Sequence, residues 1–244
     1  NWRSPNGALK DMSCRIALLK LQEGGIIALP PPRSIPVKNR RKVISSHEKA
    51  IKKSTVCGSL SELGRVSVVQ VDSGSSRSSR LWTELMEMYH YLGSGPLCGA
   101  QIRYLIHSER QGYLGGLSFS APAWTVSARD LWIGWDDKIR RRHLQRIVSN
   151  SRFLIVPTVD VPNLASHVLS LSIRSLSNDW QRRYGVEPLL LETFVERVRF
   201  SGTCYRAANW IYVGSTQGRG RQDRKNTYSI PVKDVYMYPL VKDA

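Results

Sequence analysis

The chain has 244 residues, of which 41% are hydrophobic, and its 36 Lys and Arg against 19 Asp and Glu give a formal net charge of +17. This hydrophobic fraction excludes a disordered chain, and no run of about 18 apolar residues indicates a membrane span. The charge predicts a polyanionic partner, with DNA the first expectation and no membrane partner, and we expect a cytoplasmic protein.

The cysteines and histidines form no ligand pattern. Cys14, Cys57, Cys98 and Cys204 are widely spread and include no CxxC pair. This spacing argues against a zinc site and against a disulfide framework, and it fits a reducing compartment. We therefore expect no metal.

Residues 1–33 are predicted to form a small unit. A helix capped by Asp11 or Ser13 ends at Gly24-Gly25, and a strand over 26–29 is stopped by Pro30. A helix, a turn and a short strand are typical of the second half of a winged helix, which predicts a partial winged-helix DNA-binding unit. Its DNA contacts would come from Lys10, Ser13, Arg15 and Lys20. The alternative is a plain helical subdomain with solvated lysines.

Residues 34–80 are predicted to be a linker, basic at first and serine-rich at its end. Arg40, Arg41 and Lys42 are expected to lie near phosphates when nucleic acid is bound, and a solvated tether is the alternative. The segment 66–71 has the composition of a strand. The run 73–80 lacks the apolar residues that a core requires.

Residues 81–244 are predicted to form a mixed α/β domain. A helix over 82–89 has apolar residues at helical spacing, and two antiparallel strands follow at 101–106 and 113–120. A basic helix over 136–148 then carries three arginines that we expect to contact nucleic acid: Arg140, Arg141 and Arg142.

A strand, a helix and a second strand follow in the sequence. The first strand, 152–156, ends at Pro157, which marks a bulge or an edge, and the helix runs from Asn163 to a C-cap at Gly185. The next strand covers 189–195, and such a connection predicts parallel pairing through a right-handed crossover. A short helix at 205–210 and strands at 211–213 and 232–240 complete the domain.

This order of elements resembles the acyltransferases of the GCN5-related N-acetyltransferase superfamily, so the predicted fold class is mixed α/β (α+β) of that type. The resemblance implies a bulge in the fourth strand, at Pro157, that opens a cleft for acyl-CoA, and a general acid at Tyr205. The superfamily's glycine-rich pyrophosphate loop is missing before the central helix. There, Asn163 and Ser166 either hold a phosphate with free N–H groups or belong to an ordinary capped helix.

Three further residues have the chemistry of catalytic groups. Glu192, mid-strand among apolar neighbours, is either salt-bridged to an arginine or a general base with a raised pKa. His90, between two tyrosines, is either a base or a core contact. Cys204, beside Tyr205, is either a nucleophile or a buried structural thiol.

Residues 200–225 hold the densest group of candidates. A glycine-rich loop there suits a phosphate, with Asn209 in the same predicted pocket. The loop residues are Gly218, Arg219, Gly220, Arg221, Arg224 and Lys225. Trp210, with Tyr212 and Arg206, makes an aromatic and basic cluster of the kind that stacks bases. A solvated basic loop and an aromatic core beside a basic rim are the alternatives.

Several longer motifs carry a family resemblance: Tyr89-His90-Tyr91-Leu92-Gly93, Asn150-Ser151-Arg152-Phe153-Leu154, Pro162–Ser166, Leu191–Val195, Gly202–Trp210 and Gly214–Gly220. They resemble the A component of the Druantia anti-phage defence system and a related domain at the N-terminus of some bacterial transposases. The resemblance implies a defence protein with other defence subunits as partners. Three functions stay open: a transferase acting on nucleic acid, a non-catalytic nucleic-acid sensor, and the targeting module of a transposase.

Overall fold

The computed structural model describes residues 11–30, 55–72, 74, 76–97, 99–218 and 231–241, and the chain divides into two units, Asn1–Ser45 and Ser46–Ala244. In the first unit, α1 (Asp11–Glu23) ends at a glycine turn, where the Ile26 amide donates to the Leu21 carbonyl at 2.9 Å. The expected strand over 26–29 is wrong, because no described residue of this unit pairs with it. The winged-helix unit stays a prediction.

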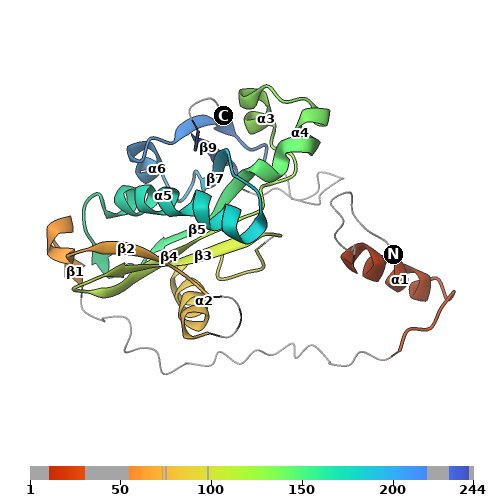
Figure 1. The fold of residues 1–244 in the computed structure, drawn as a ribbon, viewed down its shortest axis with the longest axis horizontal. Coiled ribbons are helices and arrows are strands. Elements are labelled where there is room, and N and C mark those ends of the chain that lie inside the picture. The colour runs from red at the N-terminus through yellow and green to blue at the C-terminus, as the bar shows by residue number, and fades with distance from the viewer. Residues whose placement is uncertain are drawn as a thin grey trace. The chain divides into compact units, whose positions relative to one another are not determined.

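The second unit is built on a seven-stranded sheet with the order β2-β3-β4-β5-β7-β9-β8 (Figure 1). Its strands are β2 (Val66–Gln70), β3 (Gln101–Ser108), β4 (Gly112–Ser120), β5 (Ile147–Ile155), β7 (Leu190–Glu196), β8 (Ile211–Ser215) and β9 (Lys233–Pro239). Every neighbouring pair is antiparallel except β5 and β7, which are parallel. The predicted hairpin and the predicted parallel crossover are therefore confirmed. A short parallel pair, β1 (Val56–Cys57) and β6 (Val159–Asp160), lies outside this sheet.

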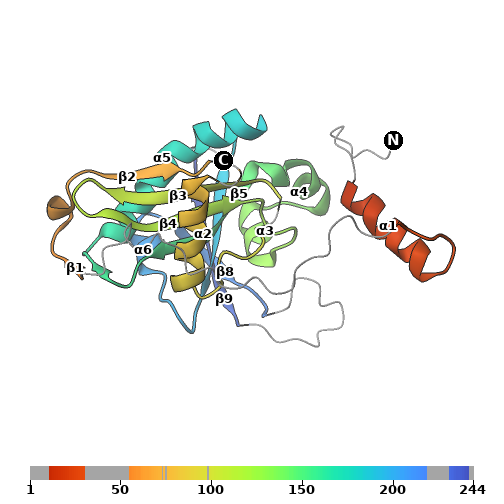
Figure 2. The ribbon, with the colours of Figure 1, turned by 90° about the horizontal axis from the view of Figure 1, so that it is seen from below.

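Helices cover both faces of the sheet. The helices of this unit are α2 (Arg77–Tyr89), α3 (Ser127–Ile133), α4 (Asp137–His143), α5 (Leu164–Tyr184) and α6 (Thr203–Ala207), with 3-10 turns η2 (Leu60–Leu63) and η3 (Leu144–Arg146). Helix α2 packs Trp82 and Leu85 on one face of the sheet, whereas α5 packs Val168 and Leu169 on the other. Figure 2, seen from below, shows α2 in front of the sheet and α5 behind it.

The sheet begins earlier in the sequence than the predicted domain boundary at residue 81. Strand β2 pairs with β3 over its whole length, and α2 begins at Arg77. Ser76 caps this helix, because its hydroxyl accepts the Ser79 amide at 3.1 Å, and Ser79 is buried. The prediction that the end of the run 73–80 lies outside the packed domain is therefore wrong. Serines suit the cap and the first turn of a helix, and here they begin α2.

The predicted basic helix over 136–148 is also wrong in its length. Helix α4 ends at His143, and β5 begins at Ile147. Ile147 and Val148 are fully buried and pair with Leu190 and Leu191 of β7. Burial between two strands outweighs helix propensity there, because both faces of a central strand are apolar.

Two glycines in β4 are explained by close packing. Gly115 has φ 156°, and a Cβ there would meet the carbonyl oxygen of Leu154 on β5. A Cβ on Gly116 would lie 3.0 Å from Trp82 of α2. These glycines let α2 and β5 approach β4 and do not weaken the strand.

Candidate nucleic-acid interface at the splayed strands

The central feature of the candidate site is a divergence of the two parallel strands. Pairing of β5 with β7 stops at Asn150 and Thr193, although both strands continue. Beside this point the register of β4 and β5 shifts, so that Ser151 forms a bulge between Asn150 and Arg152. The prediction that the bulge lies at Pro157 is therefore wrong. The pairing of β5 with β4, and not the missing N–H group of the proline, decides where β5 bends.

The bulge turns neighbouring side chains to opposite faces of the sheet. The Asn150 Oδ1 accepts a hydrogen bond from the hydroxyl of Tyr205 in α6 at 2.7 Å. Arg152 points to the other face, where its Nε donates to the Gly93 carbonyl, beyond the end of α2, at 2.9 Å. Thr193 Oγ1 donates to the Asn150 carbonyl at 3.1 Å. Four of the motifs that carry the family resemblance thus meet at this divergence.

Aromatic side chains fill the space on the α6 side of the divergence. The ring centroid of Tyr205 lies 6.3 Å from that of Phe153, 5.2 Å from Trp210 and 6.0 Å from Tyr236. Tyr205 and Trp210 are both buried. Burial raises the pKa of Tyr205, so its phenol stays protonated. Trp210 was expected to stack bases, and that expectation is wrong because its ring lies in the core.

An acyl-CoA arm does not fit these residues. The resemblance implies the arm between the diverging strands, and there the Tyr205 ring contacts Phe153 and its hydroxyl is bonded to Asn150. At the start of α5, Asn163 has φ 64° and accepts the Ser166 hydroxyl on its carbonyl at 3.1 Å. The contacts described for Asn163 and Ser166 are local to this turn. We therefore derive no chemistry through CoA.

Cys204 and His90 have shifted pKa values that disfavour the roles predicted for them. Burial raises the pKa of the Cys204 thiol, which disfavours the thiolate that a nucleophile requires. Burial, with the nearby charge of Arg152, lowers the pKa of His90 to about 4. Its Nδ1 accepts the Leu92 amide at 3.2 Å, so the neutral ring carries its proton on Nε2.

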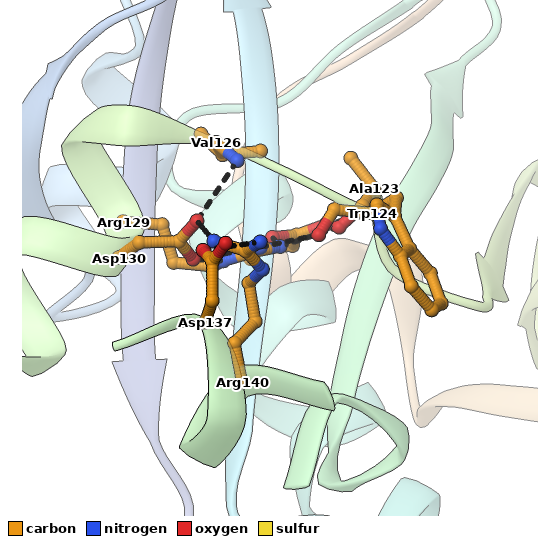
Figure 3. Close-up of polar contacts among 8 residues, drawn as sticks. Ala123, Trp124, Val126, Arg129, Asp130, Asp137 and Arg140 are labelled. Carbon is orange, nitrogen blue, oxygen red and sulfur yellow. Dashed lines mark hydrogen bonds and ion pairs between the residues drawn. The ribbon is translucent and has the colours of Figure 1, made fainter. Parts of the chain in front are cut away.

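Glu192 is held in a buried ion pair with Arg129, which Figure 3 shows with its other partners, among them Ala123 and Asp130. Its Oε2 accepts from Arg129 Nη1 at 2.7 Å, its Oε1 accepts from the Ala123 amide at 2.9 Å, and both side chains are fully buried. Burial raises the pKa of Glu192, while Arg129 and the Ala123 amide oppose the rise. Of the two alternatives for Glu192, the salt bridge is the one observed. A carboxylate with both oxygens engaged is not placed to take a proton from a substrate.

The same network includes a second arginine. Arg129 also pairs with Asp130 at 2.8 Å, and Asp130 pairs with Arg140 at 3.2 Å. Arg140 pairs further with Asp137 at 2.8 Å and is buried. The expectation that Arg140 contacts nucleic acid is therefore wrong, because its charge is already neutralised. Arg141 and Arg142 beside it are exposed, and their role stays a prediction.

At the open end of the divergence lie five residues that we call the Arg152 cluster: His90, Tyr91, Arg152, Arg199 and Phe200. The rings of His90 and Tyr91 stack with centroids 4.9 Å apart, and Phe200 lies 5.7 Å from Tyr91. The Arg199 guanidinium lies 5.2 Å from the Tyr91 centroid. Tyr91 is 38% exposed and Phe200 50% exposed, so this aromatic pair faces solvent, unlike Trp210.

Arg152 is the unusual charge in this cluster. It is partly buried, and no carboxylate among the described residues forms an ion pair with it, whereas Arg199 pairs with Glu196 at 2.8 Å. Burial lowers the pKa of Arg152, while the nearby Tyr91 and Glu87 oppose this fall. A partly buried guanidinium without a partner anion favours an incoming anion.

The remaining predicted residues lie elsewhere or are not described. Arg15 is exposed on α1, and Asn209 is exposed after α6 with φ 63°. Gly218 follows β8 with φ 70°. Outside the described residues are Lys10, Arg40, Arg41, Lys42, Arg219, Gly220, Arg221, Arg224 and Lys225.

Sequence reasoning missed Arg152, Tyr91 and Arg129 as site residues. Arg152 and Tyr91 stand within the quoted motifs, and an arginine inside an otherwise apolar strand was the usable indication. Arg129 gave no local indication, because its partner Glu192 is 63 positions away.

Residues 20–230 match the protein family described as Druantia protein DruA. The chain belongs to the DruA family. The matched region contains the Arg152 cluster and the buried ion-pair network, and the family resemblance found in the sequence is confirmed. A search of curated proteins gave no match to this DruA-family chain.

Solved structures similar to the DruA-family chain include several N-acetyltransferases. The spermidine N-acetyltransferase of Vibrio cholerae, in complex with CoA and spermine, is 9% identical, with a TM-score of 0.45 over 73% of this chain and 97% of the other. The N-acetyltransferase of Staphylococcus aureus Mu50 is 10% identical, with a TM-score of 0.41 over 72% and 98%. A probable acetyltransferase of Chromobacterium violaceum is 12% identical, with a TM-score of 0.40 over 87% and 98%. These are likenesses of fold alone.

Two further properties concern only the described part of the DruA-family chain. None of its helices is long and apolar enough to cross a membrane. Within the same residues, no three His, Cys, Asp or Glu side chains come together in a way that could hold a metal ion.

Proposed function

We propose that this protein is a nucleic-acid-binding component of an anti-phage defence system, in which the acetyltransferase-like sheet is a scaffold for recognition. DNA is the expected partner, other defence subunits act with it, and the cytoplasm is its place of action. The observation that carries the proposal is Arg152, a partly buried arginine without a carboxylate partner in the described residues, beside the exposed rings of Tyr91 and Phe200.

Charge supports the proposal at the level of the whole chain. The net charge of +17 exceeds what solubility requires, and a basic protein attracts a phosphate backbone over distances of about a Debye length. The family described as Druantia protein DruA supports the defence role. The N-terminal unit and the basic linker are proposed to add phosphate contacts, among them one from Arg15, which is exposed on α1.

The contacts of the catalytic candidates favour recognition over chemistry. Glu192 is paired with Arg129, Tyr205 is buried against Asn150, and the Cys204 thiol has a raised pKa. A transferase acting on nucleic acid requires at least one such group to reach its substrate. We therefore prefer the non-catalytic interpretation.

The test is binding of a labelled duplex and a labelled single strand, followed by fluorescence anisotropy from 50 to 300 mM salt. Arg152→Gln should weaken binding of one or both forms and reduce the slope of log K against log salt by about 1, the value for one lost phosphate contact. Arg174→Gln is the matched control, because Arg174 is exposed on α5, which covers the opposite face from α2.

Two results would contradict the proposal. Wild-type protein that binds neither duplex nor single strand at 50 mM salt would remove nucleic acid as the partner. Equal loss in Arg152→Gln and Arg174→Gln would show that only net charge matters and that the Arg152 cluster is not the site. Circular dichroism of each variant checks that the fold is intact.

A further inference from the structure

A second cationic site lies at the other end of α2, away from the Arg152 cluster. A cavity of about 310 Å³ is lined by Val71, Gly74, Gln101, Arg103 and Arg183. These residues come from the position just after β2, the turn before α2, the start of β3 and the last turn of α5. The volume is at the lower end of that of small-ligand pockets.

Arg103 is fixed in position within this cavity. Its guanidinium lies 5.2 Å from the ring centroid of Trp82, and its Nη2 donates to Ser79 Oγ at 3.1 Å. Both partners belong to α2, and both are buried. A guanidinium held on two sides loses little further entropy when it binds an anion.

Neither arginine of the cavity is neutralised by a carboxylate of the described residues. No ion pair to Arg103 or Arg183 exists among the residues that the structure describes, whereas the adjacent Arg182 pairs with Asp179. Burial, together with the charge of Arg183, lowers the pKa of Arg103, so the two cations act on each other. Like charges held together in a partly buried cavity are unfavourable until an anion lies between them.

We propose that this cavity binds a phosphate group between Arg103 and Arg183, with Gln101 on its wall. Arginine pairs suit phosphate because guanidinium donors match its oxygens two at a time. The phosphate comes either from the backbone of a nucleic acid strand or from a free phosphorylated molecule such as a nucleotide. The site is separate from the Arg152 cluster, because Ser79 and Gly93 are contacted at opposite ends of α2.

The test uses Arg183→Gln, since Arg183 is exposed and its loss leaves the contacts of Arg103 intact. Arg182→Gln is the control, with the same change of charge one residue away. Inorganic phosphate and adenosine monophosphate are titrated and followed by ³¹P NMR line broadening, and a labelled oligonucleotide is followed by anisotropy. All three proteins are compared at one ionic strength.

For a free phosphorylated molecule, we expect saturable binding of adenosine monophosphate that weakens about tenfold in Arg183→Gln and is unchanged in Arg182→Gln. For a nucleic acid backbone, we expect the oligonucleotide to lose affinity and about 1 in salt slope in Arg183→Gln alone. Equal behaviour of the two variants toward every probe would overturn the site. Failure here leaves the Arg152 test unaffected, since Arg152→Gln changes neither lining arginine.

Discussion

The ion pair between Arg129 and Glu192 gives the sharpest prediction, because it separates a structural role from a catalytic one. Arg129→Met leaves Glu192 buried with no cation and leaves Asp130 with Arg140 alone. Removing one partner of a buried pair costs about 3–5 kcal/mol. A domain of this size loses roughly 2–4 °C of Tm per kcal/mol, so we expect Tm to fall by roughly 6–20 °C.

Glu192→Gln should destabilise the protein less than Arg129→Met. Glutamine keeps an oxygen for the Ala123 amide, and Arg129 keeps Asp130, so the loss should be smaller than in Arg129→Met. The double variant Arg129→Met with Glu192→Leu should recover part of the stability, since apolar replacement of a buried pair is often neutral. Thermal and urea unfolding of the full chain measure all three.

The refuting result is specific. Glu192→Gln with unchanged Tm and with nucleic-acid binding or any activity abolished would show that Glu192 acts on a ligand. Lost stability with binding retained at low temperature would support the structural role. A double variant less stable than either single variant would show that the pair is not the cause of the loss.

Three further predictions concern Tyr205, Gly115 and His90. Tyr205→Phe should cost about 1–3 kcal/mol in urea unfolding, because the buried Asn150 Oδ1 loses its donor, and oligonucleotide binding should be unchanged; lost binding would indicate a direct role. Gly115→Ala should lower Tm much more than Gly134→Ala, since only the first adds a Cβ against a carbonyl oxygen. His90 should titrate near pH 4 by NMR, well below the pKa of 6.5 in an unfolded chain. Between pH 6.5 and pH 4 the unfolded state binds more protons than the folded state, so the free energy of unfolding should fall as the pH is lowered. His90→Asn should reduce this loss of stability. Titration near 6.5 would contradict it.

Periodicity and residue type were sufficient for the elements that lie in one continuous stretch. The α5 helix with its Gly185 cap, the β3–β4 hairpin and the parallel crossover all follow from local patterns. The bulge at Ser151 does not, because it depends on the pairing of β5 with β4. A proline is a local indication of a bend, whereas strand register is set by the neighbouring strand.

The candidate site shows the same contrast between local patterns and contacts that depend on distant residues. Asn150 and Tyr205 both stand in the motifs that carry the family resemblance, and they meet in the structure, although the sequence did not predict that contact. Their exposure could not be predicted. Trp210 and Glu192 are residue types that often bind ligands or act in catalysis. Their structural role follows from their buried contacts, Trp210 with the Tyr205 ring and Glu192 with the Arg129 guanidinium.

The two cationic sites share one helix, and this constrains how a strand could use them. Arg103 contacts Ser79 near the start of α2, and Arg152 contacts Gly93 beyond its end. Ten residues of helix from Ser79 to Tyr89 span roughly 15 Å, which is about four phosphates at the spacing of one DNA strand. A strand of that length or longer could occupy both sites, and the second contact would then be intramolecular. In that case the losses from Arg152→Gln and Arg183→Gln would be coupled for a long oligonucleotide and independent for a dinucleotide, because only the long strand spans α2.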